Sequence, residues 1–101
     1  MSRLVFSPAA RSDLVEIGDY IARDSKANPR RFVARLREQC KRIGKLPSAY
    51  PLRDKEAGIR FAPIGRYLIF FREEGDMVRI ERVLHGARNL GAMLPGAGSS
   101  D

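Results

Sequence analysis

Groups that could act in acid–base chemistry gather in the second half of this sequence. Cleavage of RNA needs a group that activates the 2′-hydroxyl, a cation that stabilises the phosphorane, and an acid that protonates the leaving oxygen. A histidine suits the first or the last role, and His85 is the only histidine of the chain. The other candidates are Tyr67, Glu81, Arg60, Arg66, Arg72, Arg79, Arg82 and Arg88.

Two features argue against an enzyme. No histidine or tyrosine follows His85, so neither residue type can supply a second acid or base near the C-terminus. A lone histidine at the end of a strand is more often structural, and we expect His85 to hydrogen-bond the end of the last strand. We therefore predict no catalytic residue.

Metal and cofactor chemistry has little support. One cysteine and one histidine without ligand spacing do not form a metal site, and we expect no metal. Cys40 lies among apolar residues and is interpreted as a small core residue. Gly58, Gly65 and Gly75 fall at turns and do not form a phosphate-binding loop, so no cofactor is expected.

The arginines of the last strands allow two interpretations. Arg79 and Glu81 alternate with Val78 and Ile80, so they face away from the apolar side of their strand. They form either a solvated face with cross-strand ion pairs or a docking surface for an acidic partner. Both interpretations stay open for Arg60, Arg79 and Arg82, whereas the solvated face is favoured for Arg72.

Charge is concentrated in one segment. The net charge is +7 over 101 residues, which suffice for one domain. Between residues 26 and 45, Glu38 is the only acid. The bases there are Lys26, Arg30, Arg31, Arg35, Arg37, Lys41, Arg42 and Lys45. This excess predicts an acidic partner, either a nucleic acid or a protein. No apolar run is long enough to span a membrane, and a single cysteine fits the cytoplasm.

Periodicity predicts the elements that position these residues. A short strand over residues 2–6 precedes a helix over about 8–24, which begins at Ser7-Pro8. A second helix begins at Asn28-Pro29 and ends near Gly44; we expect Phe32, Val33, Leu36, Cys40 and Ile43 to form its apolar stripe. Residues 48–58 read as a loop. Strands over 59–63, 66–72 and 77–84 follow, with a four-residue turn at 73–76.

The predicted fold class is α+β. An N-terminal strand and a helical hairpin precede a three-strand antiparallel meander, and the strands form one twisted sheet. We expect residues 1–90 to be a single domain and residues 91–101, which are rich in glycine, alanine and serine, to be a flexible tail.

Four segments together resemble the ParE toxins of the ParE/RelE superfamily. They are the opening FSPAARSDLVEIGDYIA, the Asn-Pro start of the second helix, the strand GRYLIFF, and the ending RVLHGARNL. The resemblance implies the toxin of a type II toxin–antitoxin system, neutralised by a ParD-like antitoxin and inhibiting DNA gyrase. It also implies that DNA is contacted only indirectly, through the antitoxin. The related RelE toxins, which are ribosome-dependent mRNA endoribonucleases, are the alternative.

The binding residues expected from this resemblance lie in the second half of the chain. They would contact the antitoxin or the target, and they are Arg60, Arg66, Arg79, Arg82, His85, Arg88 and Leu90.

Overall fold

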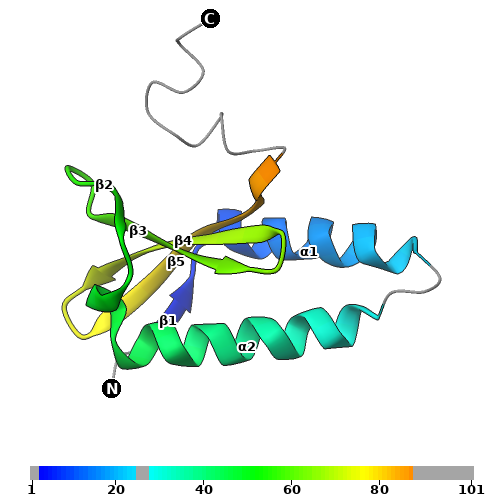
Figure 1. Ribbon diagram of the computed structural model, residues 1–101, viewed down its shortest axis with the longest axis horizontal. Coiled ribbons are helices and arrows are strands. Elements are labelled where there is room, and N and C mark those ends of the chain that lie inside the picture. Colours follow the sequence, from blue (N-terminus) through cyan, green and yellow to red (C-terminus); the bar gives the residue numbers. More distant parts are fainter. Residues whose placement is uncertain (1–2, 25–27, 88–101) are drawn as a thin grey trace, which may run out of the picture.

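The computed structural model describes residues 3–24 and 28–87, which form two helices and a five-stranded sheet. The elements in chain order are β1 (Arg3–Phe6), α1 (Pro8–Ala22), α2 (Pro29–Lys45), the short 3₁₀ turn η1 (Pro47–Ala49), β2 (Leu52–Asp54), β3 (Ile59–Ile64), β4 (Tyr67–Glu74) and β5 (Met77–His85). The predicted α+β class is confirmed (Figure 1).

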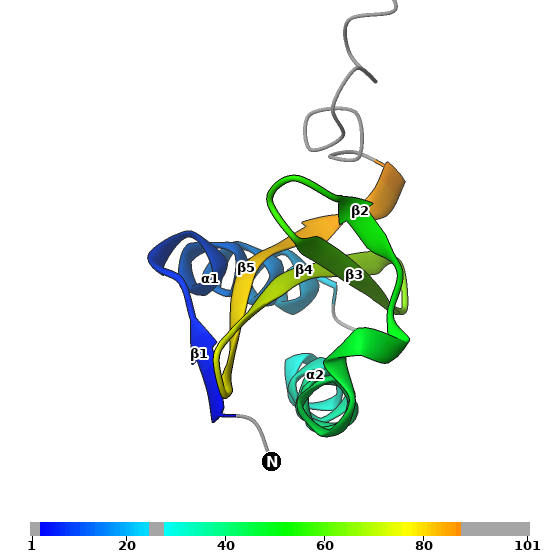
Figure 2. The same ribbon diagram turned by 90° about the vertical axis from the view of Figure 1, so that its left-hand side faces the viewer.

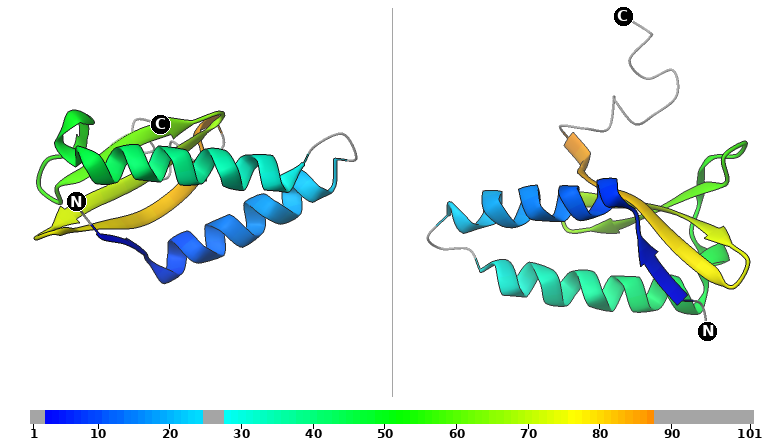
Figure 3. Two further views of the ribbon diagram at one scale, coloured as in Figure 1. Left: turned by 90° about the horizontal axis from the view of Figure 1, so that it is seen from below. Right: turned by 180° about the vertical axis from the view of Figure 1, so that it is seen from behind.

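The sheet has the strand order β1-β5-β4-β3-β2. The strands from β2 to β5 pair antiparallel, as a meander should, whereas β1 pairs in parallel with β5. A parallel pair needs a long crossover, and the two helices together with the other strands supply it. Figure 2 shows the sheet curving from β1 to β2 over α2, and Figure 3 shows β1 beside β5 from behind.

Both helices begin as the sequence predicts. The Ser7 hydroxyl accepts a hydrogen bond from the backbone N–H of Ala10 at 2.9 Å. The Asn28 side chain accepts one from the backbone N–H of Arg30, also at 2.9 Å. In each helix proline occupies the first turn, where its missing N–H costs no hydrogen bond. These caps fix where each helix leaves the preceding segment.

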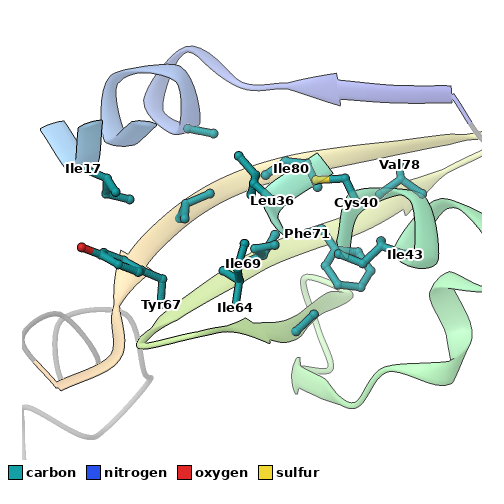
Figure 4. Packing of buried hydrophobic residues seen from close by; sticks show 13 residues of the cluster. Ile17, Leu36, Cys40, Ile43, Ile64, Tyr67, Ile69, Phe71, Val78 and Ile80 are labelled. Atoms are coloured by element: carbon teal, nitrogen blue, oxygen red, sulfur yellow. The ribbon is translucent and has the colours of Figure 1, made fainter. Parts of the chain in front are cut away.

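One hydrophobic core lies between the helices and the sheet (Figure 4). The helices contribute Ala10 and Ile17 from α1 and Leu36, Cys40 and Ile43 from α2. The facing strands contribute Ala62, Ile64, Tyr67, Ile69, Phe71, Val78, Ile80 and Val83. Phe70 and Phe71 are both fully buried although successive strand residues face opposite sides of the sheet.

Three local predictions were wrong. Residues 52–54 form a short edge strand, β2, inside the segment interpreted as a loop, which makes five strands instead of four. The β4–β5 turn spans only Gly75 and Asp76, because β4 extends to Glu74, two residues further than expected, whereas β5 begins at Met77 as predicted. Gly75 in this turn has a positive φ of 62°. Val33 is 45% exposed, because it lies at the edge of the α2 stripe and not at its centre.

Candidate binding surfaces

Beyond the end of β1, the backbone of β5 is hydrogen-bonded to Ser7, the residue that precedes α1. Pairing with β1 ends at Phe6 and Ile80, so the following backbone groups of β5 need other partners. The backbone N–H of Ser7 donates to the carbonyl of Ile80 at 2.9 Å. The Ser7 hydroxyl donates to the carbonyl of Glu81 at 2.7 Å while it caps α1. One serine therefore ends a strand pairing and begins a helix.

Asp13 continues this edge one turn further along α1. It is 5% exposed, and its Oδ2 accepts a hydrogen bond from the backbone N–H of Val83 at 2.9 Å. The Arg82 guanidinium donates to both carboxylate oxygens, at 2.8 Å from Nε and 2.9 Å from the terminal nitrogen. This hydrogen bond raises the pKa of Arg82 above its ordinary value. The pair locks α1 to β5 beside a bulge in the β4–β5 register.

Sequence reasoning did not single out Asp13. A signal was nevertheless present, because Asp13 lies three residues after Ala10 and four before Ile17, which places a carboxylate on the apolar stripe of α1. A charged residue in such a position is buried only with a partner. The partner could not be identified locally, since it lies 69 residues away in the sequence.

His85 lies at the end of β5 against an aromatic ring. Its ring meets that of Tyr67 edge to face, with centroids 5.3 Å apart. The expected hydrogen bond is not found at Nδ1, which is buried and has no hydrogen-bond partner among the described residues. The edge-to-face contact with Tyr67 is therefore the interaction that the described residues show for His85.

The pocket beside His85 is small. Its volume is about 100 Å³, and Asp13, Glu16, Tyr20 and Arg82 also line it. Since a water molecule occupies roughly 30 Å³ in the liquid, the pocket holds a few waters and is well below the roughly 300 Å³ of a small-ligand site. The arginine that lines the pocket, Arg82, already donates hydrogen bonds to both carboxylate oxygens of Asp13.

The arginines of β3, β4 and β5 are paired with carboxylates. Arg60 lies 3.8 Å from Glu73 and also donates to the carbonyl of Tyr50 at 2.6 Å. The Glu81 carboxylate forms ion pairs with two arginines, Arg79 at 3.2 Å and Arg72 at 2.8 Å. The contact from Arg72 Nε is close in distance but not aligned as a hydrogen bond. This surface corresponds to the solvated face with ion pairs that the sequence allowed.

The cations on the outer side of α2, in contrast, mostly lack carboxylate partners in the described chain. Its exposed cations are Arg30, Arg31, Arg35, Arg37, Lys41, Arg42 and Lys45. Among the described residues, the only ion pair of this set joins Lys41 to Glu38 at 3.7 Å, with both side chains largely exposed. Arg42 lies 3.5 Å from the Gln39 amide oxygen. The strongest unneutralised positive charge of the described chain is therefore on α2.

The structure separates the residues predicted to bind a partner. Arg60 and Arg79 lie in the ion pairs of the sheet, and Arg82 is bound to Asp13. Arg66 is exposed at the β3–β4 turn, where its carbonyl accepts from the backbone N–H of Gly86 at 2.9 Å. Arg88 and Leu90 lie outside the described residues. No helix within the described ranges is long and apolar enough to cross a membrane.

Comparison with solved structures supports the architecture. The chain is similar to one from the "Chromosomal ParDE TA system from P. aeruginosa", with a TM-score of 0.70 and 21% identity over 84% of this chain and 96% of that one. At this identity the likeness shows the fold alone. The molecule thus belongs to the class of α+β proteins in which a helical hairpin covers one face of a largely antiparallel sheet.

The sequence places it more narrowly. Residues 4–90 match the family described as the ParE toxin of the type II toxin–antitoxin system parDE. The chain belongs to the ParE toxin family, which confirms the resemblance seen in the sequence. No curated protein matches it.

Proposed function

We propose that this ParE-family toxin is held inactive by a ParD-like antitoxin in the cytoplasm and that, once free, it inhibits DNA gyrase and stops replication. The family match over residues 4–90 supports a toxin of a type II system. The similar P. aeruginosa chain comes from a system whose name pairs ParD with ParE, which supports the antitoxin as partner. Inhibition of gyrase is the activity that the family resemblance implies.

We further propose that the toxin acts by binding, without chemistry of its own. The observation that carries this proposal is the surroundings of His85. The adjoining pocket of about 100 Å³ is too small to enclose a nucleotide. Its arginine is engaged by the Asp13 carboxylate, which offsets the positive charge that a phosphorane would need.

Expression of the toxin in cells tests the target. Induction of the DNA-damage response without cleavage of messenger RNA is the expected outcome, and purified toxin should lower the supercoiling activity of gyrase. Cleaved messenger RNA with no damage response would favour the ribosome-dependent endoribonuclease instead.

Substitution of His85 tests the mechanism. His85→Gln keeps a polar side chain of similar reach but cannot shuttle protons. We expect this variant to keep most of the toxicity. Tyr67→Phe is the matched control, because it preserves the ring contact and removes the hydroxyl. A folded His85→Gln protein that had lost toxicity would overturn the binding mechanism.

Deletion of residues 91–101 tests the predicted tail. These residues lie outside the described ranges, and their composition of small residues predicts little contribution to a core. We expect the deletion to reduce toxicity while thermal unfolding stays unchanged. A lower melting temperature would show that the segment belongs to the domain.

A further inference from the structure

Two hollows lie on opposite flanks of α2, and Ala34 belongs to both. The first, of about 460 Å³, is lined by Ala34, Arg35, Glu38, Gln39, Arg42 and the β3–β4 turn at Pro63, Ile64 and Gly65. The second, of about 360 Å³, is lined by Pro29, Arg30, Val33, Ala34 and Arg37. Each is large enough to receive a sizeable side chain.

Each hollow combines apolar residues with two arginines. In the first, Pro63 and Ile64 lie beside Arg35 and Arg42. In the second, Val33 is 45% exposed and lies beside Arg30 and Arg37. None of these four arginines has a carboxylate partner among the described residues, unlike Arg60, Arg72, Arg79 and Arg82 of the sheet.

The first hollow has a fixed wall. The Gln39 amide donates to the carbonyl of Pro63 at 2.7 Å and so ties α2 to β3. Gly65 adopts a positive φ of 58°, and a side chain there would meet the Arg35 guanidinium at 3.4 Å. The absence of a side chain thus leaves room for Arg35 against the turn. A surface held in this way loses little conformational entropy when it binds.

Between the two hollows, the short side chain of Ala34 leaves a depression on the outward side of α2. Its neighbours one turn away, Arg30, Arg31, Arg37 and Glu38, have long side chains, whereas Ala34 has only a methyl group. An extended chain can cross the helix at this position and send one side chain into each hollow.

We propose that an acidic peptide segment crosses α2 at Ala34, places an apolar side chain in each hollow, and pairs its carboxylates with Arg30, Arg35, Arg37 and Arg42. The inference rests on the proposed function for the source of the segment, which is the antitoxin. It adds the place of contact and the chemistry of the segment.

The observations favour a peptide over a nucleic acid. A phosphate backbone would satisfy the arginines but offers no apolar group for Val33 or for Pro63 and Ile64. No aromatic side chain lines either hollow, so bases have nothing to stack on. An acidic peptide with apolar residues satisfies both parts of the surface, through apolar anchors and faster encounter.

Anisotropy titrations of purified full-length toxin test the proposal. The first probe is a labelled synthetic peptide in which glutamates alternate with leucines, and duplex DNA of mixed sequence is the second. Ala34→Gln keeps helix propensity and fills the crossing point without altering charge. We expect it to weaken peptide binding about tenfold, as loss of a central contact does. Arg35→Gln with Arg42→Gln should weaken it at least as much.

Two matched variants serve as controls. Arg72→Gln removes a paired cation of the sheet and should leave peptide binding unchanged. Glu38→Gln removes the only carboxylate of α2 and should strengthen binding about twofold, because a like charge facing the peptide is removed.

The outcomes separate this proposal from the proposed function. Unchanged peptide affinity in Ala34→Gln would overturn the crossing at Ala34. Tight binding of DNA, equal in wild type and Ala34→Gln and without peptide binding, would identify a phosphate-binding face and overturn it too. Neither titration contains gyrase or antitoxin. Peptide binding that behaves as expected would therefore stand even if the toxin proved not to act on gyrase.

Discussion

The arginines of β3–β5 and those of α2 are the same residue type, but the former are paired with carboxylates and, among the described residues, the latter are not. Arg72 and Arg79 share Glu81, Arg60 faces Glu73, and Arg82 is held by Asp13. On α2 a single carboxylate, Glu38, faces seven cations and pairs with Lys41 alone. The number of arginines in a segment therefore does not tell how many are free to bind a partner.

The difference has a geometric cause. Neighbouring strands place side chains about 5 Å apart on the same face, so Arg60 meets Glu73 and Arg72 meets Glu81 there, while α1 brings Asp13 to Arg82. The outer side of α2 meets solvent, and only its own residues three and four positions apart can pair. Because those residues are nearly all basic, the charge stays unneutralised.

The first prediction concerns the ion pair between Asp13 of α1 and Arg82 of β5. Asp13→Ala removes the acceptor for the Val83 N–H and leaves Arg82 without its carboxylate. We expect a loss of about 2 to 3 kcal/mol in the free energy of unfolding. The loss is smaller than for a fully buried pair, because the Arg82 guanidinium can still reach water. Urea denaturation measures it.

Asp19→Asn is the control, because this exposed acid lies on the same helix. Its effect should stay within about 0.5 kcal/mol of zero. Equal stabilities of the two variants would show that the Asp13 pair does not hold α1 to β5.

The second prediction concerns Ser7. Ser7→Ala removes both the cap of α1 and the hydrogen bond to the Glu81 carbonyl. Loss of an N-cap costs roughly 1 to 2 kcal/mol, and the second bond places this case toward the upper end. Asn28→Ala removes only a cap, at an exposed position, and should cost less. The reverse order in thermal or urea unfolding would contradict the double role of Ser7.

Ser7 and Asp13 show which parts of the molecule could be predicted from the sequence and which could not. The caps, most of each helix stripe and the order of the elements along the chain follow from short-range periodicity, so they could be predicted. Strand β2 could not, since it has only three residues and two of them are exposed. The role of Asp13 could not, because its partners lie about seventy residues away. The ion pairs of Arg60 with Glu73 and of Arg82 with Asp13 could not be predicted either, because the register of β3 with β4 and the packing of α1 on β5 were unknown.

The third prediction uses the inner side of α2. Burial raises the pKa of the Cys40 thiol from 9.0 to about 11. Between these values the unfolded chain loses its thiol proton and the folded protein keeps it, so stability present below pH 9 falls as the pH rises. The contribution should drop by about 1 kcal/mol between roughly pH 8 and pH 9.5.

A Cys40→Ala variant isolates this contribution, because all other groups titrate alike in both proteins. The stability difference between wild type and variant should shrink as the pH rises through this range. A difference that stays constant would mean that the thiol is not shielded from water in the folded state.

The last prediction sets the two groups of arginines against each other and involves the smallest energies. Arg79→Gln removes an ion pair with Glu81 and should destabilise the protein by about 0.5 kcal/mol. Arg31→Gln removes a cation that has no carboxylate partner in the described chain and that lies four residues before Arg35, a spacing at which like charges repel. It should stabilise the protein by roughly 0.2 to 0.5 kcal/mol. Salt screens attraction and repulsion alike, so both effects should shrink when urea unfolding is repeated at high ionic strength. Because the two substitutions make the same chemical change, effects of the same sign would refute the distinction between paired and unpaired arginines.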